Sequence, residues 1–248
     1  MLEIKNLNVT LEGDCGKVQV IKDINLTLDN KKIYVITGPN GGGKSSIAKA
    51  VMGIYPISSG RILLDGVDVS AMEIFERARS GIGYAFQQPP RFKGIKVREL
   101  LSWAAGSEDA EKLHELLFEV GLCAEDYLDR EINTAFSGGE LKRIEIASIL
   151  ARNLKVAMFD EPEAGIDLWS FQKLTETFIK MNEKYDTTIV IISHQERILR
   201  LADEVILVAD GKISEITSHE KILGEIQLLD SDCIYNKDCC KGGRPNAR

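Results

Sequence analysis

The chain has 248 residues, of which 44% are hydrophobic and 28% charged, a composition typical of a globular protein rather than a disordered one. Its formal net charge of −7 disfavours nucleic acid and anionic membranes as default partners. No apolar run approaches the roughly 18 residues that span a bilayer, and the N-terminus lacks the layout of a signal peptide. The five cysteines, an odd number, suit a reducing compartment, so we expect a cytoplasmic protein.

The first third of the chain alternates between predicted strands and predicted helices. Apolar and polar residues alternate near the N-terminus and again over 18–28, and Gly13 and Gly16 mark the turn between these two strands. The next predicted elements are strands over 32–38, 60–66 and 83–86 and helices over 45–55 and 71–80.

From about residue 95 to 152 the apolar spacing changes to i, i+3, i+4, i+7, which predicts helices. Strands return at 156–159 and 188–193 around a helix over 168–184, and 204–209 forms a hairpin with 212–216. This order predicts an α/β fold in one domain over 1–228, with a helical subdomain at about 88–152. Residues 229–248 have no apolar period and are expected to form a flexible tail.

A glycine-rich segment at residues 38–45 matches the pattern G-x-x-x-x-G-K-[ST]. Glycines let the backbone wrap phosphate oxygens, Lys44 would reach the β- and γ-phosphates, and the Ser45 hydroxyl would ligate Mg²⁺. An ordinary glycine-rich turn is the alternative, but the predicted strand before the segment and helix after it favour the phosphate-binding interpretation.

Two acids, Asp160 and Glu161, end the apolar strand over 156–159. A phosphate-loop NTPase needs an acid at a neighbouring strand end to hold Mg²⁺, a role that fits Asp160. Glu161 would polarise the attacking water as a general base. By itself such a strand end also fits a solvated pair of acids at the start of a loop, and the phosphate loop upstream favours the catalytic interpretation.

The segment Phe136-Ser137-Gly138-Gly139-Glu140 opens a predicted helix, so Ser137 can cap that helix and the glycine N–H groups can bind an anion. Together with the preceding motifs it resembles the signature loop of the ABC ATPases, which is commonly LSGGQ. The order of the remaining motifs is also similar to the family: Gln87 matches the Q-loop, 164–167 the D-loop and His194 the switch histidine. A lone histidine at a strand end is more often structural, but the ordered set favours function. The resemblance covers about residues 1–225.

This resemblance implies an ATPase that uses ATP and Mg²⁺, with an ABC-type P-loop fold built of a RecA-like core, an antiparallel β subdomain and a helical subdomain. It also implies an ATP-dependent head-to-tail homodimer in which the signature loop of one chain closes over Lys44 of the other. The implied site residues are Gly38, Pro39, Asn40, Gly41, Gly42, Gly43, Lys44, Ser45 and Ser46 for nucleotide; Ser45, Gln87 and Asp160 for Mg²⁺; Lys44, Glu161 and His194 for catalysis; and Ser137, Gly138, Gly139, Glu140 and the D-loop Asp167 across the dimer.

One departure from the family concerns the aromatic residue that often stacks on adenine after the first strand. Its place falls near Cys15, and residues 8–20 contain no aromatic side chain. Aliphatic side chains such as Val18 or Val20 would then support the base, so phosphate binding is better defined by the sequence than the identity of the base.

Three segments, AFQQPPRFKGIKVRELL, FSGGELKR and DEPEAGID, resemble the SufC type of ABC ATPase, which serves iron–sulfur cluster assembly. This resemblance implies an ATPase that drives conformational change in a soluble scaffold with SufB-like or SufD-like subunits. The alternative is the nucleotide-binding subunit of an ABC membrane transporter. Nucleic-acid-acting members usually carry two cassettes or a long coiled-coil insert, and neither direct membrane insertion nor nucleic-acid binding is expected here.

Two further features leave alternatives open. Cys233, Cys239 and Cys240 in the tail either contact a metal or cluster transiently or are simply reactive thiols, and their spacing is untypical of structural zinc. Lys142, where many ABC ATPases carry Gln, either pairs with Glu161 or Glu163 and restrains the general base, or points to solvent.

Overall fold

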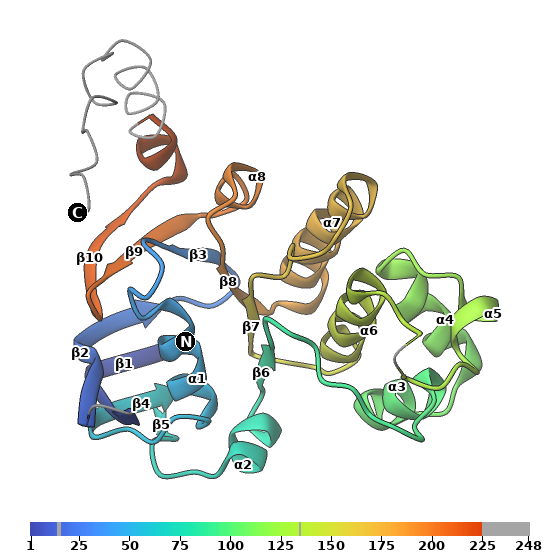
Figure 1. The fold of residues 1–248 in the computed structure, drawn as a ribbon, viewed down its shortest axis with the longest axis horizontal. Coiled ribbons are helices and arrows are strands. Elements are labelled where there is room, and N and C mark those ends of the chain that lie inside the picture. Colours follow the sequence, from blue (N-terminus) through green and yellow to red (C-terminus); the bar gives the residue numbers. More distant parts are fainter. Residues whose placement is uncertain (14–15, 134, 225–248) are drawn as a thin grey trace, which may run out of the picture.

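A computed structural model of the chain describes residues 1–13, 16–133 and 135–224. Two β-sheets and a set of helices make up the fold (Figure 1). The strands are β1 (Leu2–Gly13), β2 (Gly16–Leu28), β3 (Ile33–Thr37), β4 (Ser59–Leu64), β5 (Val67–Asp68), β6 (Ile82–Ala85), β7 (Val156–Asp160), β8 (Thr188–Ile192), β9 (Glu204–Ala209) and β10 (Lys212–Thr217). The helices are α1 (Lys44–Met52), α2 (Ile74–Arg79), α3 (Val97–Ala105), α4 (Ala110–Glu119), α5 (Ala124–Tyr127), α6 (Gly138–Leu150), α7 (Leu168–Tyr185) and α8 (Glu196–Leu199).

The first sheet is antiparallel and has the strand order β2-β1-β4-β5. Its β1 strand buries Leu2 and Ile4 and then Leu7 and Val9, so the apolar alternation shifts by one residue. A register shift between Ile4 and Leu7 accounts for the change, because the left-handed backbone of Asn6 (φ 50°) inserts a residue and returns the apolar side chains to the same face.

The second sheet has the order β10-β9-β3-β8-β7-β6, and all its neighbouring strands are parallel except the β10–β9 hairpin. Its central strands are buried on both faces, as their nearly continuous apolar sequence predicts. Alternate residues therefore belong to different cores: Phe159 and Ile191 face one hydrophobic cluster, and Met158 and Val190 face the other.

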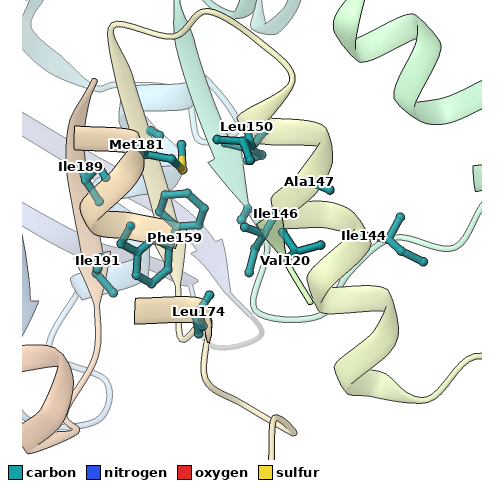
Figure 2. Packing of buried hydrophobic residues seen from close by; sticks show 14 of the residues in the cluster. Val120, Ile144, Ile146, Ala147, Leu150, Phe159, Leu174, Met181, Ile189 and Ile191 are labelled. Carbon is teal, nitrogen blue, oxygen red and sulfur yellow. The ribbon is translucent and has the colours of Figure 1, made fainter. Parts of the chain in front are cut away.

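One of these clusters joins the parallel sheet to α6 and α7. Figure 2 shows Phe159 of β7 and the neighbouring β8 residues pointing toward side chains of both helices. The rings of Phe159 and Phe178 lie 4.7 Å apart, and both side chains are fully buried. The other cluster fills the space between the sheet's second face, α1 and the antiparallel sheet. The parallel sheet is thus the middle layer of the core.

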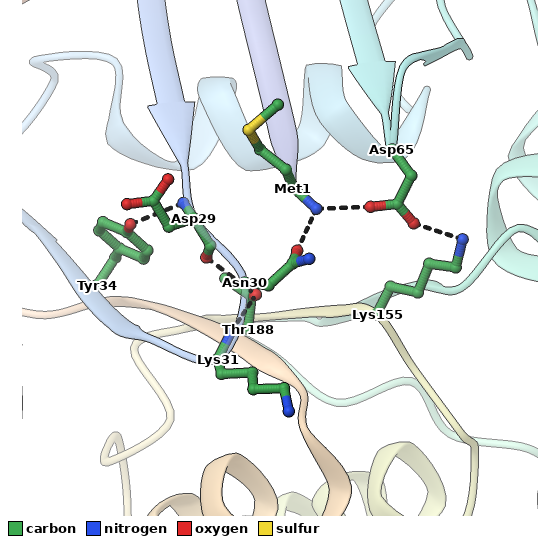
Figure 3. A network of polar contacts seen from close by, with 8 residues as sticks. All are labelled: Met1, Asp29, Asn30, Lys31, Tyr34, Asp65, Lys155 and Thr188. Carbon is green, nitrogen blue, oxygen red and sulfur yellow. Dashed lines mark hydrogen bonds and ion pairs between the residues drawn. The ribbon is translucent and has the colours of Figure 1, made fainter.

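Polar contacts tie the two sheets together near the amino ends of β7 and β8 (Figure 3). Lys155, just before β7, forms an ion pair with Asp65 (2.5 Å), which also binds the amino group of Met1 (2.6 Å). The Lys31 N–H donates to Thr188 at the start of β8 (3.1 Å). These contacts fix the amino ends of the strands, and the loops that follow their carboxyl ends carry the residues considered below.

The predicted fold class is confirmed: a mixed α/β core is combined with an antiparallel sheet and a helical part. The four helices α3 to α6 lie between residues 97 and 150. Within the described residues, no helix is both long and apolar enough to cross a membrane. Cys233, Cys239 and Cys240 lie outside the described residues, as does Cys15.

Candidate nucleotide site

The loop between β3 and α1 approaches neighbouring backbone too closely for side chains at two positions. A Cβ atom on Gly38 would lie 2.1 Å from the carbonyl oxygen of Val208, and one on Gly42 would lie 2.9 Å from the same atom. The loop ends at Gly43, whose left-handed backbone (φ 103°) caps α1 without a side chain. The first N–H groups of α1 therefore point from a helix N-terminus into the loop, which is an arrangement that attracts anions.

Lys44 lies beneath this loop and is only 8% exposed. Its ammonium donates to the carbonyl oxygens of Gly38 (2.8 Å) and Pro39 (2.9 Å). A cavity of about 190 Å³ opens beside the lysine. Its lining residues are Val20, Asn40, Gly41, Gly42, Gly43, Lys44, Ser45, Ser46 and Glu161. The structure therefore brings the predicted residues Asn40 to Ser46 to one cavity, together with Glu161 and with Val20, one of the two aliphatic side chains suggested for the base. Gly38 and Pro39 do not line this cavity, and their carbonyl oxygens bind the Lys44 ammonium instead.

Asp160 ends β7 and is almost fully buried, with 1% of its surface exposed. One carboxylate oxygen accepts from the Ser45 hydroxyl (2.9 Å) and the other from the Tyr84 hydroxyl (2.8 Å). A hydroxyl and a carboxylate are the hard oxygen ligands that Mg²⁺ prefers, so Ser45 and Asp160 fit a magnesium site. Sequence reasoning missed Tyr84; the only signal was a residue with a polar hydroxyl in an otherwise apolar strand.

The position of Tyr84 beside Asp160 shifts the pKa of the tyrosine hydroxyl. Burial together with the charge of Asp160 raises the pKa of the Tyr84 hydroxyl far above its ordinary value. The tyrosine therefore stays a hydrogen-bond donor to the Asp160 carboxylate at all physiological pH values.

Glu161 follows β7 with a left-handed backbone (φ 45°), which is unusual for a residue with a side chain. Its N–H is bonded to the carbonyl of Ile192 at the end of β8 (2.9 Å), so the neighbouring strand holds this conformation. The Gln87 amide nitrogen donates to the Glu161 carboxylate (2.6 Å). The predicted metal ligand and the predicted general base are thus in direct contact, and the Gln87 oxygen is the atom suited to a metal.

Behind Glu161, the side chain of Glu163 is buried and accepts a hydrogen bond from the Ser193 hydroxyl. Ser193 in turn accepts from the N–H of Gln195 (3.0 Å), so the backbone on both sides of His194 is held while the His194 side chain is exposed. Burial raises the pKa of Glu163 above its ordinary value, although the Ser193 hydrogen bond and His194 act in the opposite direction.

The predicted signature segment begins α6. Ser137 accepts from the Glu140 N–H (3.2 Å) and Glu140 accepts from the Ser137 N–H (2.7 Å), a reciprocal cap. The Glu140 carboxylate also binds the Tyr127 hydroxyl and lies 3.8 Å from Arg130, and these contacts lower its pKa, the tyrosine bond contributing most. The signature glutamate is therefore engaged within its own chain.

The signature segment does not line the loop cavity of its own chain. Figure 1 shows α1 and α6 well apart, with β6 and β7 drawn between them. Instead, Gly139 lies against the D-loop, where a Cβ atom would approach the Gly165 carbonyl oxygen to 2.9 Å. Asp167 in that loop accepts hydrogen bonds from the N–H (3.0 Å) and the hydroxyl (2.7 Å) of Ser170.

Both sequence interpretations of Lys142 are wrong. The side chain is 1% exposed rather than solvated, and its ion pair is with Glu145 (3.3 Å) instead of Glu161 or Glu163. Its ammonium also donates to the carbonyl oxygen of Phe86. The error arose because the sequence does not reveal that the peptide before Gln87 reaches the second turn of α6.

A mostly apolar groove of about 140 Å³ lies beside this contact. Phe86 and Phe92 are partly exposed along it, and Glu145 of α6 forms part of its wall. The remaining lining residues are Tyr84, Pro90, Leu100, Ile132, Leu141, Ile144, Ser148, Ile149 and Arg152. Over the described part of the chain, no group of three or more His, Cys, Asp or Glu side chains is arranged to hold a metal.

A phosphate loop before α1, with a serine in the first turn of α1 that is bonded to an acid at the end of β7, defines a P-loop nucleotide-binding protein. The family model described as ABC transporter matches residues 21–164. An uncharacterised ABC transporter ATP-binding protein of Methanocaldococcus jannaschii is 37% identical, covering 97% of this chain and 94% of that protein. A probable ABC transporter ATP-binding protein of Streptococcus pyogenes is 36% identical, covering 86% of this chain and 87% of that protein.

The chain therefore belongs to the ABC family of ATP-binding proteins, which hydrolyse ATP with Mg²⁺. Among solved structures, a dimeric ATP-binding cassette in a post-hydrolysis state with ADP and phosphate has the same fold. It is 22% identical with a TM-score of 0.80, and the match covers 88% of this chain and 99% of that one. The predicted family, enzyme class and cofactors are confirmed.

Proposed function

We propose that this chain is the ATP-hydrolysing subunit of a larger assembly and that it works as an ATP-dependent, head-to-tail dimer. The observation that carries the proposal is the division of the site. The loop cavity holds Lys44, Ser45 and Glu161, whereas Ser137–Glu140 lies outside it in the same chain. A second chain would supply the missing signature segment, and the dimeric cassette with the same fold supports this arrangement.

The polar residues in and around the cavity would have the following roles in the proposed reaction. The N-terminus of α1 and Lys44 would bind the phosphates, and Ser45, Asp160 and Gln87 would hold Mg²⁺, which stabilises the charge of the transferred phosphoryl group. Glu161 would accept a proton from the attacking water. For this, the Gln87 amide must release the Glu161 carboxylate. His194, exposed at the end of β8, would contact the γ-phosphate.

We propose a membrane transporter as the assembly, with a permease segment bound in the groove beside Phe86 and Phe92. The two relatives described above support this choice, because they are named as ABC transporter ATP-binding proteins. The second candidate is the iron–sulfur scaffold with SufB-like or SufD-like subunits. The variants FSGGELKR and DEPEAGID favour it, and it remains a prediction from the sequence.

Crosslinking in the native host would separate these two candidates. A photoreactive residue at Phe92, in the groove, should capture a multi-span protein in the membrane fraction, whereas the same group at exposed Val67 of β5 should not. Capture of a scaffold protein from the soluble fraction would overturn the transporter proposal and support iron–sulfur assembly. Equal capture from both positions would overturn the groove as the docking site.

A further inference from the structure

The second turn of α6 carries a buried ion pair. Lys142 and Glu145 lie 3.3 Å apart, and their side chains are 1% and 9% exposed. Removing two charges from water costs free energy that their mutual attraction often fails to recover, so such a pair is weak support for stability. The Glu145 oxygen that faces Lys142, Oε2, has no other polar partner among the described residues. The pair therefore needs an explanation other than its own attraction.

Both charges contact the same residue, Phe86. The Lys142 ammonium donates to the Phe86 carbonyl, and the Glu145 carboxylate accepts from the Phe86 N–H (2.8 Å). Phe86 follows β6, the edge strand, and the pairing of β6 with β7 ends at Ala85. The N–H and carbonyl of Phe86 therefore lie beyond the paired part of the sheet. They form strong hydrogen bonds to charged side chains instead.

Phe86 is followed directly by Gln87, whose amide is bonded to the Glu161 carboxylate (2.6 Å). A continuous set of contacts thus runs from α6 through the backbone of Phe86 to Gln87 and then to the general base. The same helix begins with the signature segment, one turn before Lys142. A displacement of α6 would therefore move the peptide that carries Gln87.

We infer that Lys142 and Glu145 are positioning residues that grip both backbone groups of Phe86 and so couple the movement of α6 to the placement of Gln87 beside Glu161. This inference rests on the proposed function, because it requires the signature segment and the groove to be contacted by other chains. A nucleotide bound to the second chain would pull on α6 through Ser137–Glu140. A partner in the groove would press on Phe86 and Glu145 directly.

Hydrogen exchange at individual backbone amides tests whether Lys142 and Glu145 hold Phe86. It is measured on the full chain without nucleotide. Lys142→Met removes the charge at similar length, and Glu145→Gln keeps the shape but weakens the hydrogen bond. Each change is expected to speed exchange at the Phe86 amide about tenfold, as weakening of the hydrogen bonds that charged groups make to this residue predicts. The matched control is the Lys173–Glu176 pair of α7, which has the same spacing but is only partly buried. Lys173→Met should leave exchange at Phe86 unchanged.

Kinetics separate positioning from simple stabilisation. At saturating Mg²⁺, Lys142→Met and Glu145→Gln should each lower kcat about tenfold. The KM for ATP should stay within about twofold of the parent value, because the phosphate loop is intact. The exchanged pair Lys142→Glu/Glu145→Lys retains an ion pair but sets an acid against the Phe86 carbonyl. It should therefore keep the fast exchange and low kcat of Lys142→Met.

Parent-like exchange and kcat in the exchanged pair would overturn the inference, since the ion pair alone would then suffice. Unchanged exchange at Phe86 in the mild Glu145→Gln variant would overturn it too. The exchange measurement uses the isolated chain and needs neither hydrolysis nor a partner. If the chain bound no permease, the proposed function would be wrong. The exchange measurement would still test whether Lys142 and Glu145 hold the backbone of Phe86.

Discussion

At the scale of single residues, the site concentrates its unusual features on two consecutive acids, Asp160 at the end of β7 and Glu161 directly after it. Asp160 is held by two hydroxyl donors, whereas Glu161 takes a left-handed backbone and accepts from Gln87. Such a backbone costs about 1–3 kcal/mol and persists where surrounding structure enforces it. Here the bond from the Glu161 N–H to Ile192 does so, and it directs the carboxylate toward the loop cavity.

Replacing Glu161 should separate nucleotide binding from hydrolysis. Glu161→Gln keeps the shape of the side chain but cannot accept the proton of water, so phosphate release should fall at least about 100-fold. Binding of a fluorescent ATP analogue should stay within about threefold of the parent, because the phosphates are held by the loop. Lys44→Ala should give the opposite pattern and lose binding itself. Parent-rate turnover by Glu161→Gln would contradict the role of general base.

Glu163 predicts a pH dependence of stability. Burial raises its pKa in the folded chain above the ordinary value of 4.5, so folding favours the protonated form. Its contribution to the free energy of unfolding is therefore full below pH 4.5 and is lost as the pH rises through the pKa of Glu163 in the folded chain. The charged groups near Glu163 are His194 and Glu161. Glu163→Gln should remove that loss. Urea unfolding at several pH values should show the stability of the variant rising relative to the parent toward neutral pH; parallel curves would contradict this.

At the scale of secondary-structure elements, the parallel sheet explains why distant motifs meet. β3, β7 and β8 are adjacent and parallel, so the phosphate loop, Asp160–Glu161 and Ser193–His194 all follow carboxyl ends at one edge. α6 differs, because it contacts this edge through side chains that reach Phe86. The first turn of α6 lies away from this edge, and there the Ser137–Glu140 cap fixes the orientation of the signature glycines.

Two matched helix caps test whether the signature cap does more than stabilise. Ser137 caps α6 by accepting from the Glu140 N–H three residues on (3.2 Å), and Asp109 caps α4 by accepting from the Glu111 N–H two residues on (3.0 Å). Changing either to Ala should cost about 1 kcal/mol of stability, measured by thermal unfolding. Only Ser137→Ala should also lower the ATPase rate, by about tenfold or more, because its hydroxyl would bind the nucleotide of the other chain. Equal ATPase rates in the two variants would argue for a purely structural cap.

Local patterns predicted the phosphate loop, the acids at the end of β7 and the succession of strands and helices along the core, because each depends on a few neighbouring residues. The contacts that could not be predicted join residues far apart in the chain. Tyr84 reaches Asp160 across 76 positions, and Lys142 reaches Phe86 across 56. Lys142 has the composition of a surface residue, and only tertiary packing of α6 on the end of β6 buries it.

At the scale of the whole molecule, the parallel sheet separates two hydrophobic cores. One joins it to α1 and the antiparallel sheet, and the other to α6, α7 and the smaller helices. The phosphate loop begins at the first core, while the signature segment belongs to the second. One chain therefore carries the loop cavity and the signature segment in separate places, and the proposed dimer would bring these unlike parts of two chains together.

This division predicts that ATP controls the oligomeric state. Without nucleotide the chain should be mainly monomeric, because the γ-phosphate would complete the interface between Lys44 of one chain and Ser137–Glu140 of the other. Glu161→Gln with ATP and Mg²⁺ should shift the mass measured by light scattering from monomer toward dimer, because hydrolysis no longer removes the bridging phosphate. ADP should leave the same variant monomeric, and adding Lys44→Ala should abolish the dimer by abolishing binding. A tight homodimer that forms without nucleotide and ignores ATP would contradict the division of the site, because the interface would then not depend on the phosphate that joins its halves.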